Sequence, residues 1–99
     1  MLRISTIDTP SRRRLVVEGK LISPWATELR TAYDKAKADL EGRDLVVDLK
    51  DLTIISREGE ELVTELMKEG VKFQCRGLFA RLLLRELADR VRALKEGGS

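Results

Sequence analysis

The 99-residue sequence contains no histidine and a single cysteine, Cys75. Without histidine there is no Ser-His-Asp triad, no Cys-His dyad and no His-ligated zinc. One cysteine forms neither an internal disulfide nor a structural zinc or iron–sulfur site. The seven glycines form neither a GxGxxG motif nor a P-loop. These absences remove the residues on which most enzymes depend, so we expect a non-catalytic domain without cofactor or metal.

Long apolar runs and an excess of one charge are also missing. Apolar runs such as residues 82–84 fall far short of the roughly 20 residues that span a bilayer. The first residues lack the apolar stretch of a signal peptide. Basic and acidic residues number 19 and 17, a net charge of +2 that gives no argument for nucleic acid. We therefore expect a cytoplasmic chain that neither inserts into a membrane nor binds nucleic acid.

Apolar spacing and turn signals predict four strands and three helices. Period-2 alternation and Val/Leu-rich runs predict strands at residues 2–8, 14–21, 44–49 and 71–76, with a short extended stretch at 52–55. Helical spacing predicts two helices that end at Gly42 and Gly70. Ser23 is the expected N-cap of the first, with Pro24 as its first residue, and Ser56 is the expected N-cap of the second. A third helix is predicted over residues 78–95, and its apolar stripe is Phe79, Leu83, Leu87, Val91 and Leu94.

The order β-β-α-β-α-β-α predicts an α/β fold. Helices that alternate with strands after an opening hairpin favour a single mixed four-stranded sheet with three helices and right-handed crossovers. We expect one domain over residues 1–96 and a disordered tail at 97–99.

The stretch LVVDLKDLTIISREG at residues 45–59 resembles the central signature of the STAS domain, a family named for sulfate transporters and anti-sigma factor antagonists. The stretch VEGKLISPWATEL at residues 17–29 is similar to the family's second strand and first helix, and the order of elements matches over nearly the whole chain. The resemblance implies a regulatory module that works by protein–protein recognition. It implies an anti-sigma-type kinase, a signalling complex or a second copy of the chain as the partner.

The resemblance also implies a partner-binding surface, made of the loop at residues 53–59, the first turn of the second helix and the neighbouring face of the third. Its candidate residues are Thr53, Ser56, Arg57, Glu58 and Gly59. Aligned on Gly59, the serine that bacterial anti-sigma kinases phosphorylate falls on Glu58, so the phosphoacceptor is missing. Glu58 either imitates the phosphorylated serine or simply suits a helix start.

Two further readings of the loop and its surroundings remain open. The helix start at residues 56–59 is an alternative site for a small anion or a nucleotide phosphate, and the chain would then be a sensor. Three glutamates at this helix start, Glu58, Glu60 and Glu61, oppose an anion there, and only Arg57 compensates. Asp48 and Asp51 lack the third clustered acid that would favour a metal site.

Overall fold

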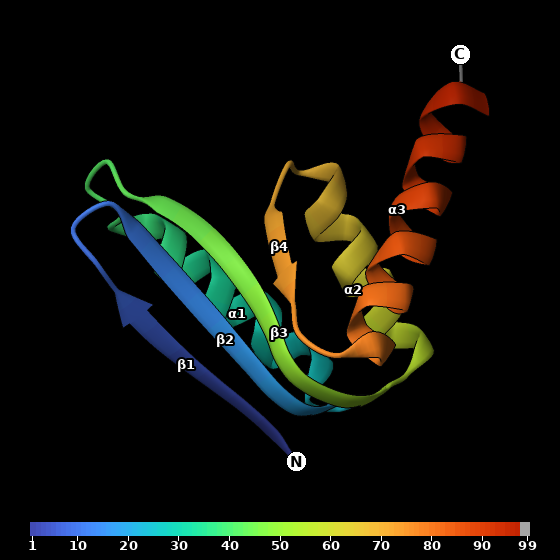
Figure 1. Ribbon diagram of the computed structural model, residues 1–99, viewed down its shortest axis with the longest axis horizontal. Coiled ribbons are helices and arrows are strands. Elements are labelled where there is room, and N and C mark those ends of the chain that lie inside the picture. The colour runs from blue at the N-terminus through green and yellow to red at the C-terminus, as the bar shows by residue number, and fades with distance from the viewer. Residues whose placement is uncertain (98–99) are drawn as a thin grey trace.

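Seven elements follow one another in the predicted order (Figure 1). The structure is a computed structural model that describes residues 1–97, with the side chains of residues 1–94. The strands are β1 (Leu2–Asp8), β2 (Arg12–Leu21), β3 (Asp44–Ile55) and β4 (Lys72–Cys75). The helices are α1 (Ala26–Ala38), α2 (Arg57–Lys68) and α3 (Leu78–Gly97).

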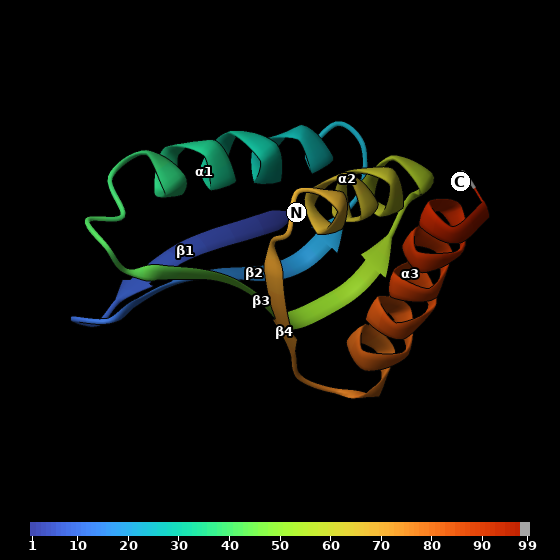
Figure 2. The ribbon, with the colours of Figure 1, turned by 90° about the horizontal axis from the view of Figure 1, so that it is seen from above.

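The four strands form one sheet in the order β1-β2-β3-β4. β1 pairs antiparallel with β2, whereas β2–β3 and β3–β4 are parallel. This arrangement confirms the predicted mixed sheet. α1 and α2 lie over one face, and α3 packs beside α2 at the β4 end of the sheet (Figure 2). Among the described residues, no helix covers the opposite face of β1, β2 and β3.

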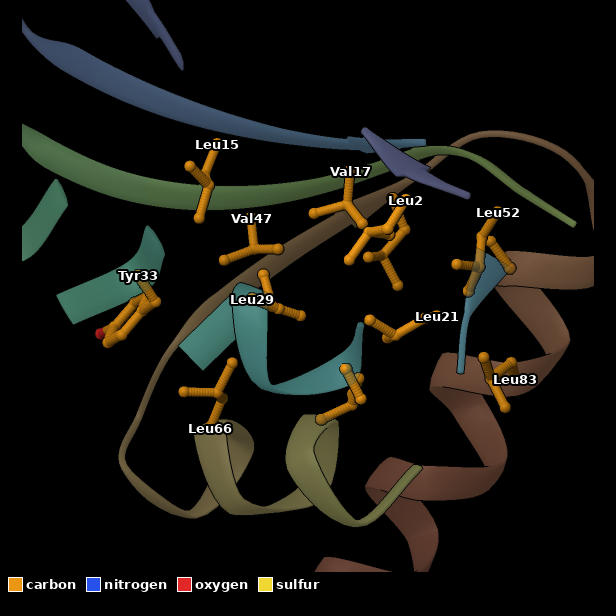
Figure 3. Packing of buried hydrophobic residues seen from close by; sticks show 14 of the residues in the cluster. Leu2, Leu15, Val17, Leu21, Leu29, Tyr33, Val47, Leu52, Leu66 and Leu83 are labelled. Carbon is orange, nitrogen blue, oxygen red and sulfur yellow. The ribbon is translucent and has the colours of Figure 1, made fainter. Parts of the chain in front are cut away.

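The core lies between the sheet and the helices. Side chains that alternate along the strands meet one stripe from each helix (Figure 3). The labelled members include Leu15, Val17 and Val47 from the sheet and Leu29, Leu66 and Leu83 from the helices. Full burial of one such side chain contributes about 1.5–3 kcal/mol, so this cluster supplies most of the driving force for folding.

The start of α1 differs from the prediction. The helix begins at Ala26, and Trp25 is its N-cap without a side-chain hydrogen bond, so Ser23 does not cap it. The amide of Ala26 donates to Ile22 O at 2.9 Å, which closes a turn before the helix proper. Residues 23–25 therefore form the connection rather than the first helical turn. Trp25 itself is half-buried and packs against the core.

β3 is one strand of 12 residues, where the sequence indicated a short strand and a separate extended stretch. The pairing with β2 shifts register between Val16 and Glu18, and this irregularity accommodates the residues between the two predicted segments. Asp48 and Asp51 consequently lie inside a strand and not at its end.

The buried stripe of α3 is narrower than predicted. Leu83, Leu87 and Val91 are buried as expected, but Phe79 is 45% exposed and Leu94 61% exposed. Ala80 replaces Phe79 against the core because its position lies one helical turn before Leu83 and Leu84 on the packed face. Phe79 is thereby left at the surface.

The C-terminal end of the chain is helical as far as the structure describes it. α3 includes Gly97, the first residue of the expected tail, and residues 98 and 99 lie outside the described residues. No described helix is both long enough and apolar enough to cross a membrane.

Candidate functional site

The loop between β3 and α2 is fixed against the end of β2. The amide of Ser56 donates to Leu21 O at 3.1 Å. Gly59, in the first turn of α2, is buried and lies so close to the same carbonyl that a Cβ would overlap it. Only glycine fits this position, so the start of α2 is held at one place over the sheet.

Ser56 caps α2 as predicted. Its backbone is extended, with φ −91° and ψ 174°, and its Oγ accepts a hydrogen bond from the amide of Gly59 at 3.2 Å. This bond satisfies one of the free N–H groups of the first turn. The structural role of Ser56 is therefore shown.

Glu58 places a negative charge at the same helix start. Hydrogen bonds from its own backbone N–H and from the Ser56 hydroxyl lower the pKa of its carboxyl below the ordinary value, despite an opposing effect of desolvation. The group is thus ionised at neutral pH. Because this carboxylate already accepts from the helix start, the geometry does not favour a second anion there.

Arg57 offsets that charge only weakly, because its charge is the smallest of the effects that lower the pKa of Glu58. Its side chain is 89% exposed and forms an ion pair with Glu61 at 3.4 Å, one turn along α2. Such an exposed pair contributes little to stability.

The structure separates two of the predicted site residues. The Thr53 hydroxyl donates to Gly19 O at 3.1 Å, and Thr53 lines a hollow between the loop and α3. Glu58 instead lines a hollow between α1 and α2, together with Arg30 and Glu65. The two residues therefore face different neighbouring helices.

The hollow beside α3 contains apolar side chains that sequence analysis did not identify. It has a volume of about 380 Å³, and the N-terminal end of α3 lies beside the loop (Figure 1). Its large exposed apolar members are Ile54 (49% exposed), Phe79 (45%) and Leu82 (51%), which we call the α3 patch. A sequence signal did exist, because apolar residues at 78–79 and 82–84 extend beyond a single helical face.

Charged groups border the α3 patch. Glu60 of α2 and Glu86 of α3 line the hollow, and both pair with Arg90, at 3.1 and 2.9 Å. An apolar centre with a charged border is the usual anatomy of a protein-recognition surface.

Asp48 is buried on the face of the sheet that no described helix covers. Only 1% of the residue is exposed, and its Oδ2 lies 3.5 Å from Arg14 Nε and 3.3 Å from Arg76. The described residues include no group of three His, Cys, Asp or Glu side chains suited to a metal ion. Asp48 thus balances two cations, Arg14 of β2 and Arg76, which directly follows β4.

Arg13 is a second ionic centre that sequence analysis missed. It is 8% exposed, pairs with Asp8 and Asp39, and donates to Ala36 O at 2.9 Å at the end of α1. Hydrogen bonds from Arg13 lower the pKa of both carboxyls. This cluster joins the β1–β2 hairpin to α1 and is structural.

Comparison with known proteins identifies the fold. No protein-family model matches the chain, and no curated protein does. Among solved structures, an uncharacterised protein of the DUF3478 family from Shewanella loihica PV-4, described as having a SpoIIAA-like fold, is similar. The TM-score is 0.53 at 19% identity, over 93% of this chain and 77% of that one. The chain therefore has the SpoIIAA-like fold, which is that of STAS domains and anti-sigma factor antagonists.

Proposed function

We propose that this chain is a non-catalytic, cytoplasmic regulatory module that binds a protein partner. The proposed contact surface is the loop at residues 53–59, the first turn of α2 and the α3 patch. The partner is an anti-sigma-type kinase or another component of a signalling complex, in line with the STAS-like fold. The lack of histidine and the single cysteine support a role without catalysis.

The α3 patch is the observation that most supports this proposal. Ile54, Phe79 and Leu82 are each about half exposed, yet they gather in one hollow next to the loop. Exposed apolar side chains are ordinary when scattered, but a group of them with a polar border marks a recognition site. Burial of such anchors against a partner would supply the main free energy of binding.

Glu58 supports a partner that responds to charge. Its lowered pKa maintains a full negative charge at the position that the family resemblance assigns to the phosphorylated serine. We infer that the chain behaves as a permanently charged form of such a module and needs no kinase to reach that state.

A pull-down with matched variants tests the proposal. Leu82→Asp places a charge in the α3 patch, whereas Leu94→Asp makes the same change at a residue that is 61% exposed near the other end of α3. A partner of the proposed surface is captured by the parent and by Leu94→Asp but is lost with Leu82→Asp. Equal capture by both variants would overturn the proposal. Circular dichroism of each variant checks that the fold is retained.

A further inference from the structure

The outer edge of β1 presents a row of unpaired backbone groups. The amide of Lys20 donates to Met1 O at 3.1 Å, so odd-numbered positions of this hairpin strand face β2. The N–H and C=O groups of the even positions point the other way, and no element within residues 1–97 lies along that side (Figure 1). These even positions are Leu2, Ile4, Thr6 and Asp8.

This edge has few of the features by which natural proteins prevent strand pairing. β1 contains no proline, glycine or lysine, and its register with β2 has no shift. Its one basic residue, Arg3, is at a position that alternates away from α1, although it also borders the hollow between β1 and α1, and Asp8 is engaged by Arg13. A regular edge with so little protection is competent to accept another strand.

A hollow between β1 and α1 adds apolar surface to the edge. It has a volume of about 570 Å³, and its lining includes Ile4 and Ala32, both half-buried. A second hollow of about 340 Å³ shares these two residues and Lys35 and extends along Thr6. A strand placed beside β1 would therefore bury apolar groups as well as satisfy backbone groups.

We propose that a second copy of this chain pairs with β1 in the antiparallel sense, centred on Ser5, so that one sheet runs through both copies. This register is the one that pairs the whole of Leu2–Asp8 with its copy. Ile4 then faces Thr6 of the second copy, and such a pair exchanges both of its backbone hydrogen bonds because these positions point outward. Ser5 faces Ser5 of the second copy in a pair without hydrogen bonds.

Charges on α1 favour a second copy over an unrelated strand. Glu28 lines the hollow near Leu2, and Lys35 lines it near Thr6; both are exposed, and neither forms an ion pair among the described residues. A two-fold axis through Ser5 makes the two α1 helices run in opposite directions. Glu28 of each copy then lies opposite Lys35 of the other. From the strand spacing the two helices would stand roughly 10–14 Å apart, within reach of these long side chains.

The proposed dimer uses a different surface from the proposed partner-binding site. β1 is one edge of the sheet, and α3 lies beyond the other (Figure 2). Pairing at β1 leaves the α3 patch free, so either proposal can fail without the other.

Charge reversal tests the pairing. Sedimentation of the parent chain from micromolar to millimolar concentration should show a dimer that dissociates on dilution. Lys35→Glu should raise the dissociation constant about tenfold or more, because two attractive pairs become repulsive. The double variant Glu28→Lys/Lys35→Glu should restore it. Lys37→Glu is the control, with the same charge change on an exposed part of α1 outside the hollow. A monomeric parent, or a double variant that dissociates like Lys35→Glu, would overturn the proposal.

Disulfide trapping tests the register. In a Cys75→Ser background, Ser5→Cys should form an intermolecular disulfide on mild oxidation, because directly opposed residues of this pair type have Cα atoms about 4.5 Å apart. Ile7→Cys lies on the same face, but the proposed register separates the two copies of residue 7 by more than about 10 Å, so it should remain reduced. Trapping of Ile7→Cys alone, or equal trapping of both variants, would contradict the register.

Discussion

Gly59 in α2 lies directly against the carbonyl oxygen of Leu21 at the end of β2, with no room for a side chain between them. The side chains of Ile55 and Leu21 close the remaining space. One contact between residues 38 positions apart thus sets where α2 begins, and with it the position of the loop at residues 53–59. The candidate site is held in place by backbone packing.

Gly59→Ala should therefore destabilise the protein. In an unconstrained helix this change stabilises by up to about 1 kcal/mol, because alanine is the better helix former. Here the new Cβ overlaps backbone that cannot move freely, so we expect a loss of about 2–4 kcal/mol. Urea denaturation measures it. Glu61→Ala, an exposed change in the same helix, is the control and should leave the midpoint almost unchanged. A Gly59→Ala protein as stable as the parent would contradict the close approach.

The cluster at Arg13 should make stability depend on acid. Arg13 holds the pKa of Asp8 and Asp39 below their ordinary value of 3.8. The unfolded chain therefore takes up protons at higher pH than the folded chain. The stabilisation that the Arg13 ion pairs give the folded protein is complete at a pH above the ordinary carboxyl pKa. It is lost as the pH falls through the lowered pKa values of Asp8 and Asp39. Urea midpoints across this range should fall less steeply in Arg13→Leu than in the parent. Arg12→Leu, a change at the exposed neighbouring position, should keep the slope of the parent.

Asp48→Asn should cost about 1–2 kcal/mol of stability, because it leaves Arg14 and Arg76 without their shared carboxylate. This loss of stability is at the low end of the range for breaking a buried ion pair. The side chains of Arg14 and Arg76 are 32% and 53% exposed, so water can hydrate them once the carboxylate is gone. Thermal or urea unfolding measures this loss. Asp51→Asn is the control, because Asp51 is exposed and has no ion pair among the described residues, and it should change stability by less than about 0.5 kcal/mol.

Glu58→Ser tests the charge at the loop and rests on the proposed function. If the fixed charge excludes a partner that prefers a neutral loop, its removal should raise affinity about ten- to hundredfold, the effect of one charge near a partly desolvated interface. Stability should change little because the carboxyl is exposed. Titration calorimetry with the captured partner measures the affinity. An unchanged affinity would show that Glu58 serves only the helix start.

Apolar spacing and helix caps were sufficient to predict the element order and the sheet. These signals are local: the alternation in β1, the Val/Leu run in β3 and the Ser56 cap each act within a few residues. The STAS-like resemblance followed from the stretch at residues 45–59, and the similarity to a SpoIIAA-like structure confirms the fold. The same resemblance, and not the apolar spacing or the helix caps, implied the loop at residues 53–59 as the candidate site.

Tertiary structure alone decided which residues meet at that site and elsewhere. Phe79 fits a helical stripe in the sequence, but Ala80 occupies the packed face, so Phe79 lies exposed beside Ile54. Arg13 belongs to an ordinary basic run until α1 brings Asp39 against it. Such contacts join residues far apart in the chain, and the crossing of α3 and the twist of the sheet determine them. The periodicity of apolar residues contains no information on the crossing of α3 or the twist of the sheet. It indicates the face of an element on which a side chain lies, but not which distant residues that side chain contacts.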